Sequence, residues 1–433
     1  MICPEPSELQ ELVRQLHRQA SPWLPAGQGS RLHWGAPVQP APGEHEPLVV
    51  STARLDRLIE HCVGDFTVTV QAGMPLQQLQ AELNRQKQWL AIDWPWGSGP
   101  AGEASGTVGG LVARGLAGGL RQRYLGVRDQ LIGIGLLRAD GTAARAGGKV
   151  VKNVAGYDLM RLFTGSWGSL GLITELTLRT FPLPPRRGGL LLQGDLQALE
   201  QLRRRCLAAP LMPQRLDWWS PEGHGQAEPA LLLTVVSVSA EAINEQLSQH
   251  RAAAEAAGLS VQRLDADGLQ ALEAMGRGCS SGGDPAVSGS HQRRDQVPGR
   301  SDAEPAPDQA AATPWLLHLG ALPARAPELL ADPALRGLRL TLAAGSGVGL
   351  AWAAPAELPL HRVEEMRRRC SALGGFLTVL QQPSGSGSSM PAWSDAPSRP
   401  LIEAIKREFD PLQQLARGRL PGVAPQPQVA STT

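Results

Sequence analysis

Between Ser105 and Phe181 the chain concentrates glycine to a degree that limits what it can fold into. The segment includes SGTVGGLVARG, then RYLGVRDQLIGIGLLRADG, then GGKVVKNVAGYDLMRLFTGSWGSLGLITELTLRTFP. Glycine has no Cβ, so its backbone can approach a ligand where any other residue would collide with it. Successive N–H groups of such a backbone form concavities that bind phosphate. The sequence therefore predicts a nucleotide cofactor held by the main chain.

Length and charge limit the rest of the molecule. A chain of 433 residues exceeds one ordinary core and predicts two domains. The formal net charge of +1, without any run of five basic residues, argues against a nucleic-acid or membrane-surface partner. We expect a helix over 1–20, a cofactor domain over 21–186, a second domain over 187–422 and a flexible tail over 423–433. Residues 276–314 contain almost no large apolar side chain and predict a disordered insertion.

The cysteines do not form a metal-binding pattern. Five are present, far apart and without a C-x-x-C pair, so the sequence supports neither a zinc site nor an iron–sulfur cluster, and we expect no bound metal. The first residues lack the apolar core of a signal peptide, and the longest apolar run, LLLTVVSV from Leu231, is too short to span a bilayer. These features predict a cytoplasmic protein, with any membrane contact made through a partner complex.

The N-terminal part alternates helix and strand patterns. Ser7 and Gln10 form a capping-box pattern before a short amphipathic segment, which we expect to be a frayed helix. Downstream we expect a strand over 48–51, a helix near 55–62, a strand over 66–73 and a helix opened by Pro75. The dipeptide Asp140-Gly141 predicts a tight hairpin turn, and LITELTLRTF alternates like a half-buried strand.

The second half has weaker patterns. The segment PLPPRRGG after Phe181 reads as a boundary. Strands and helices follow, including WLLHLGAL, a hairpin over LRLTLAAGSGVGLAWAA, the helix ELPLHRVEEMRRRCSALG and a final helix, LIEAIKREFDP. A second flexible piece, QQPSGSGSSMPAWSDAPSRP, precedes the final helix, and no internal repeat is visible.

A literal G-x-G-x-x-G at Gly97, Gly99 and Gly102 suggests a Rossmann nicotinamide site. Its context argues against that interpretation. No strand pattern precedes the motif, because DWPW places a proline where a central strand needs a hydrogen-bond donor. A loop leading into Ser105 is the alternative that we prefer.

Taken together, SGTVGGLVA, the Asp129 segment with its hairpin, KNVAGYDL and GSWGSLGLIT resemble the FAD-binding domain of the vanillyl-alcohol oxidase and p-cresol methylhydroxylase superfamily. Within that superfamily, the chain resembles the E subunit of bacterial glycolate oxidase. The resemblance covers about residues 21–185 and returns in IKREFDPLQQLARGRLPG. It implies an α+β fold, in which an FAD-binding domain of two α/β subdomains precedes a smaller, ferredoxin-like cap domain.

The resemblance also implies which residues contact FAD. The turn at 27–30 corresponds to the pyrophosphate-binding loop, and the segment from 105 to 110 to a second phosphate and flavin contact at the start of a helix, whose dipole would favour the anion. The segment 153–158 would line the isoalloxazine or ribose, and 168–173 the adenine, mainly through backbone. The residues implied are Gly27, Gln28, Gly29, Ser30, Ser105, Gly106, Thr107, Gly109, Gly110, Asp129, Lys152, Asn153, Gly156, Tyr157, Asp158, Gly168, Ser169, Gly171, Ile173 and Arg419. Ordinary turns and close helix packing remain the alternatives for the glycines.

Attachment and redox tuning follow from the same comparison. Covalent members of the superfamily commonly place a histidine in the pyrophosphate turn, whereas this turn holds Gln28 and Ser30, which favours noncovalent FAD. Lys152 or Arg419 could supply a cation near the flavin N1–C2 edge, and a solvated surface charge is the alternative.

The catalytic residues are unknown from sequence. Oxidation of a 2-hydroxy acid needs a base for the hydroxyl proton and a cation for the carboxylate, and no such cluster is visible. The pair His361 and Glu364 is more typical of a surface contact. The histidine-rich segment of related dehydrogenases is missing, which favours an FAD-carrying subunit that works with a paralogous flavoprotein and an iron–sulfur subunit. A stand-alone flavin-dependent 2-hydroxy-acid dehydrogenase is the alternative, and the superfamily's UDP-N-acetylenolpyruvoylglucosamine reductase is a more distant one.

Overall fold

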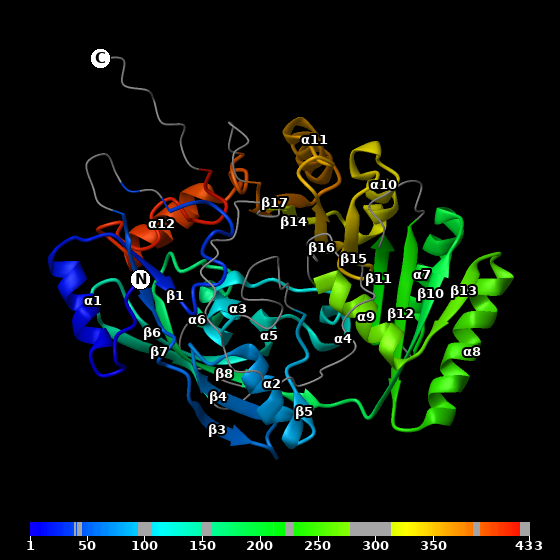
Figure 1. Ribbon diagram of the computed structural model, residues 1–433, viewed down its shortest axis with the longest axis horizontal. Helices are drawn as coiled ribbons and strands as arrows, with labels where there is room; N and C mark the ends of the chain where they lie inside the picture. Colours follow the sequence, from blue (N-terminus) through cyan, green and yellow to red (C-terminus); the bar gives the residue numbers. More distant parts are fainter. Residues whose placement is uncertain are drawn as a thin grey trace, which may run out of the picture.

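Two antiparallel sheets, joined through a shared apolar interface, organise the chain (Figure 1). The computed structural model describes residues 1–38, 40, 46–93, 106–148, 158–210, 212–220, 229–277, 313–383 and 390–424. The N-terminal module, blue to teal in Figure 1, contains the first sheet, and the C-terminal part, green to orange, contains the second. The last helix, α12 (Arg399–Phe409), lies back on the N-terminal module.

The N-terminal module is built on a five-stranded antiparallel sheet of order β3-β4-β8-β6-β7. Its strands are β3 (Leu58–Cys62), β4 (Thr67–Gln71), β8 (Leu172–Arg179), β6 (Leu131–Leu137) and β7 (Ala143–Gly147). A separate parallel pair consists of β1 (Trp23–Ala26) and β2 (Leu48–Ser51), and β5 (Gln88–Trp89) pairs with β9 (Phe181–Pro182). The helices are α2 (Leu76–Arg85), α3 (Val108–Arg114), α4 (Arg121–Tyr124), α5 (Val127–Gln130) and α6 (Leu159–Phe163). One buried apolar cluster joins this sheet to α2, α3 and α6.

Several sequence predictions hold in this module. The strands at 48–51 and 67–71, the helix after Pro75 and the hairpin at Asp140-Gly141 are all present. The turn of that hairpin is closed by the Gly141 N–H, which donates to the Arg138 carbonyl, and by the Thr142 N–H, which donates to the Asp140 carboxylate.

Two predictions in this module are wrong. The segment near 55–62 is not a helix, because residues 58–62 pair with β4 as strand β3. The N-terminal helix α1 (Leu9–Arg18) is not frayed, because Leu9, Val13 and Leu16 are buried in a cluster with Trp23 and Leu415. Its N-cap is Glu8 without a side-chain cap bond, so the capping box at Ser7 and Gln10 does not form. Packing rather than capping holds this helix.

The second sheet has eight strands in the order β13-β10-β12-β11-β15-β16-β14-β17. Its strands are β10 (Arg186–Gln193), β11 (Arg215–Ser220), β12 (Ala230–Ser237), β13 (Ser260–Leu264), β14 (Trp315–Gly320), β15 (Arg339–Ala343), β16 (Val348–Ala353) and β17 (Phe376–Gln381). Its helices are α7 (Leu196–Ala208), α8 (Ala240–Ala256), α9 (Ala266–Arg277), α10 (Ala326–Leu330) and α11 (Leu360–Ala372). Because β9 ends at Pro182 and β10 begins at Arg186, five of the eight residues of the expected boundary PLPPRRGG are in strands.

The eight strands form two units with the same βαββαβ order, a repeat that the sequence did not reveal. The first unit has the strand order β13-β10-β12-β11, and the second has β15-β16-β14-β17. Pairing of β11 with β15 joins them into one sheet. This second sheet has eight strands, against five in the main sheet of the N-terminal module.

The two faces of the large sheet have different neighbours. Helices α7, α8, α10 and α11 cover one face and bury an extensive apolar core. On the other face, α9 covers one end through Leu269 and Trp219. The other end meets the N-terminal module, where Trp34, Trp167 and Leu116 pack against cap residues that include Trp352 and Trp393. Within the described part of the chain, no helix combines the length and apolarity needed to cross a bilayer.

Candidate cofactor site

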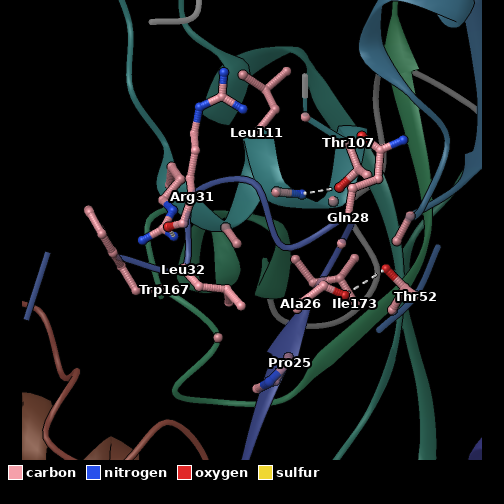
Figure 2. Close-up of a pocket in the computed structure, with 18 of the residues that line it drawn as sticks. Pro25, Ala26, Gln28, Arg31, Leu32, Thr52, Thr107, Leu111, Trp167 and Ile173 are labelled. Atoms are coloured by element: carbon pink, nitrogen blue, oxygen red, sulfur yellow. Dashed lines mark hydrogen bonds between the residues drawn. The ribbon is translucent and has the colours of Figure 1, made fainter. Parts of the chain in front are cut away.

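A cavity of about 120 Å³ opens between β1, the start of α3 and the turn before β8 (Figure 2). Most of its walls come from three segments, residues 25–32, 106–111 and 167–173. A fourth segment, which follows α12, contributes Arg419. Figure 2 shows Gln28 and Thr107 on one side of the cavity and Trp167 and Leu32 on the other. The site is therefore assembled from four chain segments that are distant in sequence.

The turn at 27–30 lies directly against the start of α3. A Cβ on Gly27 would lie 2.3 Å from Thr107 Oγ1, so only glycine allows this approach. Gly29 has φ +79°, a conformation that glycine adopts without strain. Among the described residues, no acceptor is present for the backbone N–H groups of Gln28, Gly29 and Ser30. These three donors are free to bind an anion.

The start of α3 contributes less than expected. The Val108 N–H donates to the Met74 carbonyl, and the Gly109 N–H donates to the Ala72 carbonyl at 2.7 Å. The Gly110 N–H donates to Thr107 Oγ1 at 3.1 Å. All three amides of the first turn are therefore engaged within the protein, and the predicted phosphate contact of this segment stays a prediction. Close packing is the role of Gly109, because its Cβ would lie 2.8 Å from the Ala72 carbonyl oxygen.

Arginines supply positive charge to the cavity. Arg31, Arg114 and Arg419 line it, and no aspartate or glutamate is among its described lining residues. Burial lowers the pKa of Arg419 to about 10. Burial also lowers the pKa of Arg114 well below its ordinary value, and the charges of Arg419 and Arg31 lower it further. Such desolvated cations favour an anionic ligand.

Two of these arginines hold one wall of the cavity. Arg114 donates to the Arg31 carbonyl at 2.6 Å and lies 4.0 Å over the Trp167 ring. Arg419 donates to the carbonyls of Leu32 and Ala36. The loop after the glycine turn is thereby fixed by two cations from distant segments.

Most of the residues expected to contact FAD are brought together here. The cavity is lined by Gly27, Gln28, Gly29, Ser30, Gly106, Thr107, Gly109, Gly110, Gly168, Gly171, Ile173 and Arg419. Ser105, Lys152, Asn153, Gly156 and Tyr157 lie outside the described residues, as do most of the insertion predicted at 276–314 and the G-x-G-x-x-G segment.

Three expected contacts are not in the cavity wall. Asp129 accepts a hydrogen bond from the Gly126 N–H and caps α5. Asp158 caps α6 and pairs with Arg161. Ser169 donates to the Ser166 carbonyl, and its own carbonyl accepts a bond from Lys406. Their observed contacts are structural.

Sequence reasoning missed Arg31, Arg114 and Trp167. Arg31 follows the glycine turn directly, and Arg114 is four residues after Gly110, which is one helical turn. Those spacings were the available signals. They were weak, because 41 basic residues are spread along the chain and only the fold places two of them beside a carboxylate-free cavity.

A second, smaller cavity of about 30 Å³ lies between the module and the cap sheet. Leu116 lines both cavities. On the module side the wall is Asp93 and residues 116–119, and on the cap side it includes Arg215, His318 and Thr341. A ligand in the first cavity would therefore lie next to this second cavity.

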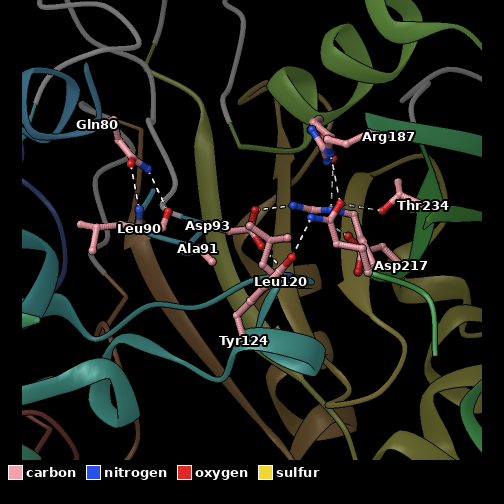
Figure 3. Close-up of polar contacts among 12 residues, drawn as sticks. Gln80, Leu90, Ala91, Asp93, Leu120, Tyr124, Arg187, Asp217 and Thr234 are labelled. Atoms are coloured by element: carbon pink, nitrogen blue, oxygen red, sulfur yellow. Dashed lines mark hydrogen bonds and ion pairs between the residues drawn. The ribbon is translucent and has the colours of Figure 1, made fainter. Parts of the chain in front are cut away.

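A buried charge cluster lies beside this second cavity and reaches its wall through Asp93 and Arg215 (Figure 3). Arg215 pairs with Asp93 of the module and, at 2.9 Å, with Asp217 of its own strand. Glu273 on α9 lies 3.5 Å from Arg215 and also pairs with Arg187. Figure 3 shows Asp93 and Asp217 on opposite sides of these contacts, with Arg187 above Asp217 in the view. The cluster connects the module to the cap.

Burial strongly affects two groups near this cavity. Burial, with Asp93 and Glu273 nearby, raises the pKa of Asp217 to about 6, and the attraction of Arg215 only partly offsets it. Burial lowers the pKa of His318 to about 4, so its imidazole is neutral at physiological pH. In the described part of the chain, no group of three histidine, cysteine or carboxylate side chains is arranged to hold a metal ion.

Comparison with known proteins shows what the N-terminal module is similar to. Residues 1–147 match the FAD binding domain family. The chain is 34% identical to glycolate oxidase subunit GlcE of Escherichia coli over 46% of this chain and 53% of that protein. It is 33% identical to glycolate oxidase subunit GlcD of Bacillus subtilis over 46% of this chain and 40% of that protein. It is 35% identical to D-2-hydroxyglutarate dehydrogenase of Xanthomonas citri over 45% of this chain and 39% of that protein. The matches thus span about half or less of these relatives.

The fold has counterparts among solved structures. A structure of alkyldihydroxyacetonephosphate synthase aligns with a TM-score of 0.62 and 12% identity over 96% of this chain and 75% of that one. The family match and this fold together confirm the resemblance to the flavin-binding superfamily that the sequence predicted.

Proposed function

We propose that the chain is the FAD-binding subunit of a glycolate oxidase-like complex that oxidises a 2-hydroxy acid to a 2-oxo acid. The family match of residues 1–147 and the similarity to two glycolate oxidase subunits and a D-2-hydroxyglutarate dehydrogenase support this function. The structural observation that carries it is a cavity whose described lining combines free turn amides and three arginines without any carboxylate.

The residues present fit FAD. The N–H groups of the 28–30 turn would bind the diphosphate, and Arg114 and Arg419 would compensate its charge. FAD bound here would supply a flavin able to accept and pass on the electrons removed from the 2-hydroxy acid. Asn153, Gly156, Tyr157 and Lys152 remain proposed FAD contacts, although they lie outside the described residues.

Noncovalent attachment is supported by the turn itself. Its side chains are Gln28 and Ser30, neither of which forms a flavin bond in this superfamily's usual manner. The nearest histidine, His33, has its Nε2 2.8 Å from Gln381 Oε1 and is held by that contact.

The proposed domain organisation places FAD in residues 21–186 and the cap in residues 187–422. Each half of the cap sheet has the βαββαβ order and the strand arrangement of a ferredoxin-like unit. The cap packs against Trp34 and Trp167, which line the cofactor cavity.

The proposed partners are a paralogous flavoprotein subunit and an iron–sulfur subunit, in a cytoplasmic complex that contacts the membrane only through a partner. A stand-alone 2-hydroxy-acid dehydrogenase is the second candidate, since the chain is also similar to a D-2-hydroxyglutarate dehydrogenase. Anaerobic mixing with glycolate separates the two. Loss of flavin absorbance only when partner subunits are present supports the complex, whereas loss with the isolated chain supports the stand-alone enzyme.

A further inference from the structure

We infer that the cavity between the module and the cap sheet rejects carboxylates, so that it admits only uncharged ligands and the 2-hydroxy acid binds on the paralogous subunit. This inference rests on the proposed function and defines what the chain's own cap can bind. The inference follows from the charges of the buried cluster around Arg215, which lies beside the second cavity.

The cluster carries more negative than positive charge. Its acidic members are Asp93, Asp217 and Glu273, and its basic members are Arg187 and Arg215. With all five ionised, one negative charge remains. Exposure of the acidic side chains is 6% for Asp93, 1% for Asp217 and 7% for Glu273, so water screens this charge little.

Arg215 is the cluster cation that lines the cavity, and both of its terminal nitrogens are already bonded, while its Nε has no hydrogen-bond partner among the described residues. Its two terminal nitrogens bond Asp93 and Asp217, and its Nε faces Glu273 at 3.5 Å. A substrate carboxylate at Arg215 would meet three carboxylates around one guanidinium. Like charges in a buried site repel strongly, so this arrangement opposes a fourth carboxylate.

His318 does not change this balance. It lines the cavity from β14, and its Nε2 has no hydrogen-bond partner among the described residues. Because its imidazole is neutral, it can exchange a hydrogen bond with a hydroxyl or amide but cannot attract an anion.

A free carboxylate oxygen also faces this region. Asp217 Oδ1 has no partner in the described structure, and a Cβ on Gly119 would lie 2.2 Å from it. Gly119 lines the cavity together with Gly118. This unpaired, buried oxygen does not line the cavity but adds negative charge beside it, which again disfavours a carboxylate ligand.

The test is a calorimetric titration of the FAD-loaded chain with glycolate and with its uncharged amide, glycolamide, at pH 7.5. We expect glycolamide to bind at least about tenfold more tightly than glycolate. Asp217→Asn removes the excess charge and retains an acceptor for Arg215, so we expect it to improve glycolate binding about tenfold and to leave glycolamide unchanged. Asp65→Asn, at an exposed position, is the matched control. Thermal melts of each variant check the fold.

The pH dependence gives an independent readout. Because Asp217 becomes protonated below about pH 6, glycolate binding to the unmodified chain should improve between pH 7.5 and 5.5 and should stay constant in Asp217→Asn. Glycolate binding equal to or tighter than glycolamide binding at pH 7.5 overturns the inference. So does an Asp217→Asn variant that still binds no glycolate. Failure of the proposed function is distinct, since it appears as missing flavin absorbance in the same sample.

Discussion

Lys406 on α12 and Ser169 in the turn before β8 are 237 residues apart, and the Lys406 ammonium donates a 2.7 Å hydrogen bond to the Ser169 carbonyl. The same ammonium pairs with Asp410 at 2.6 Å and donates to the Leu415 carbonyl. Because Gly168 and Gly171 of that turn line the cofactor cavity, the C-terminal segment fixes part of the cavity wall.

Replacing Lys406 with Met should therefore affect both folding and cofactor retention. The buried Asp410 would lose its cationic partner and keep the Gln414 and Leu415 N–H donors, and breaking such a buried pair typically costs about 3 kcal/mol. We expect a lower melting temperature and weaker FAD binding, measured by thermal denaturation and by flavin fluorescence. Arg407→Met, at an exposed position of the same helix, is the control. An unchanged FAD affinity in Lys406→Met would show that α12 does not support the cavity.

Substitutions at Gly110 and Gly109 should distinguish an effect on FAD binding from an effect on packing. A Cβ on Gly110 meets only Thr107 Oγ1, at 3.2 Å, whereas one on Gly109 meets the Ala72 backbone. We expect Gly110→Ala to fold normally and to bind FAD about tenfold more weakly, because its methyl group enters the cavity. Gly109→Val should lose both stability and FAD. Gly64→Ala, which meets nothing within 4 Å, should change neither.

Arg114 should contribute to FAD binding mainly through charge. Arg114→Gln keeps hydrogen-bonding ability and removes one desolvated cation beside the cavity. We expect about a tenfold weaker FAD affinity, a smaller effect on riboflavin, which lacks the diphosphate, and a weaker dependence of FAD affinity on salt. Titrations at low and high NaCl measure this, with the exposed Arg128→Gln as control. Equal losses for FAD and riboflavin would contradict a role in compensating phosphate charge.

Asp217 should make stability depend on pH. Its pKa is raised to about 6 from an ordinary 3.8, so the protonated form favours the fold. The stabilisation is complete below pH 3.8 and is lost as pH rises through 6, a difference of about 3 kcal/mol. Asp217→Asn should therefore raise the melting temperature at pH 7.5 and have little effect at pH 5. A variant less stable than the parent at pH 7.5 would refute this assignment.

The parts of the fold that sequence predicted are those fixed by local chemistry. The Asp140-Gly141 turn, the helix after Pro75 and the glycine turn at 27–30 each depend on backbone preferences of a few residues. The helix predicted near residues 55–62 is wrong because pairing with β4 decides the conformation there. The prediction followed the helical spacing of Leu55, Leu58, Ile59 and Cys62.

The charged parts of the site could not be predicted in this way. Asp93, Arg215 and Glu273 come from three distant segments, and nothing near any of them in sequence marks the others. Likewise, Arg114 becomes a candidate FAD contact only in the folded chain, where it lines a cavity without any aspartate or glutamate among the described lining residues. Glycine positions reveal where a ligand can approach, whereas charge balance depends on tertiary structure.

The central claim, that the cavity between the 27–30 turn and α3 holds FAD without a covalent bond, is tested most directly by titrating the flavin-free chain with FAD and then precipitating it with acid. We predict saturable one-to-one binding, with all flavin in the supernatant after precipitation. A folded chain that takes up no FAD, or one whose flavin stays with the precipitated polypeptide, would contradict the account.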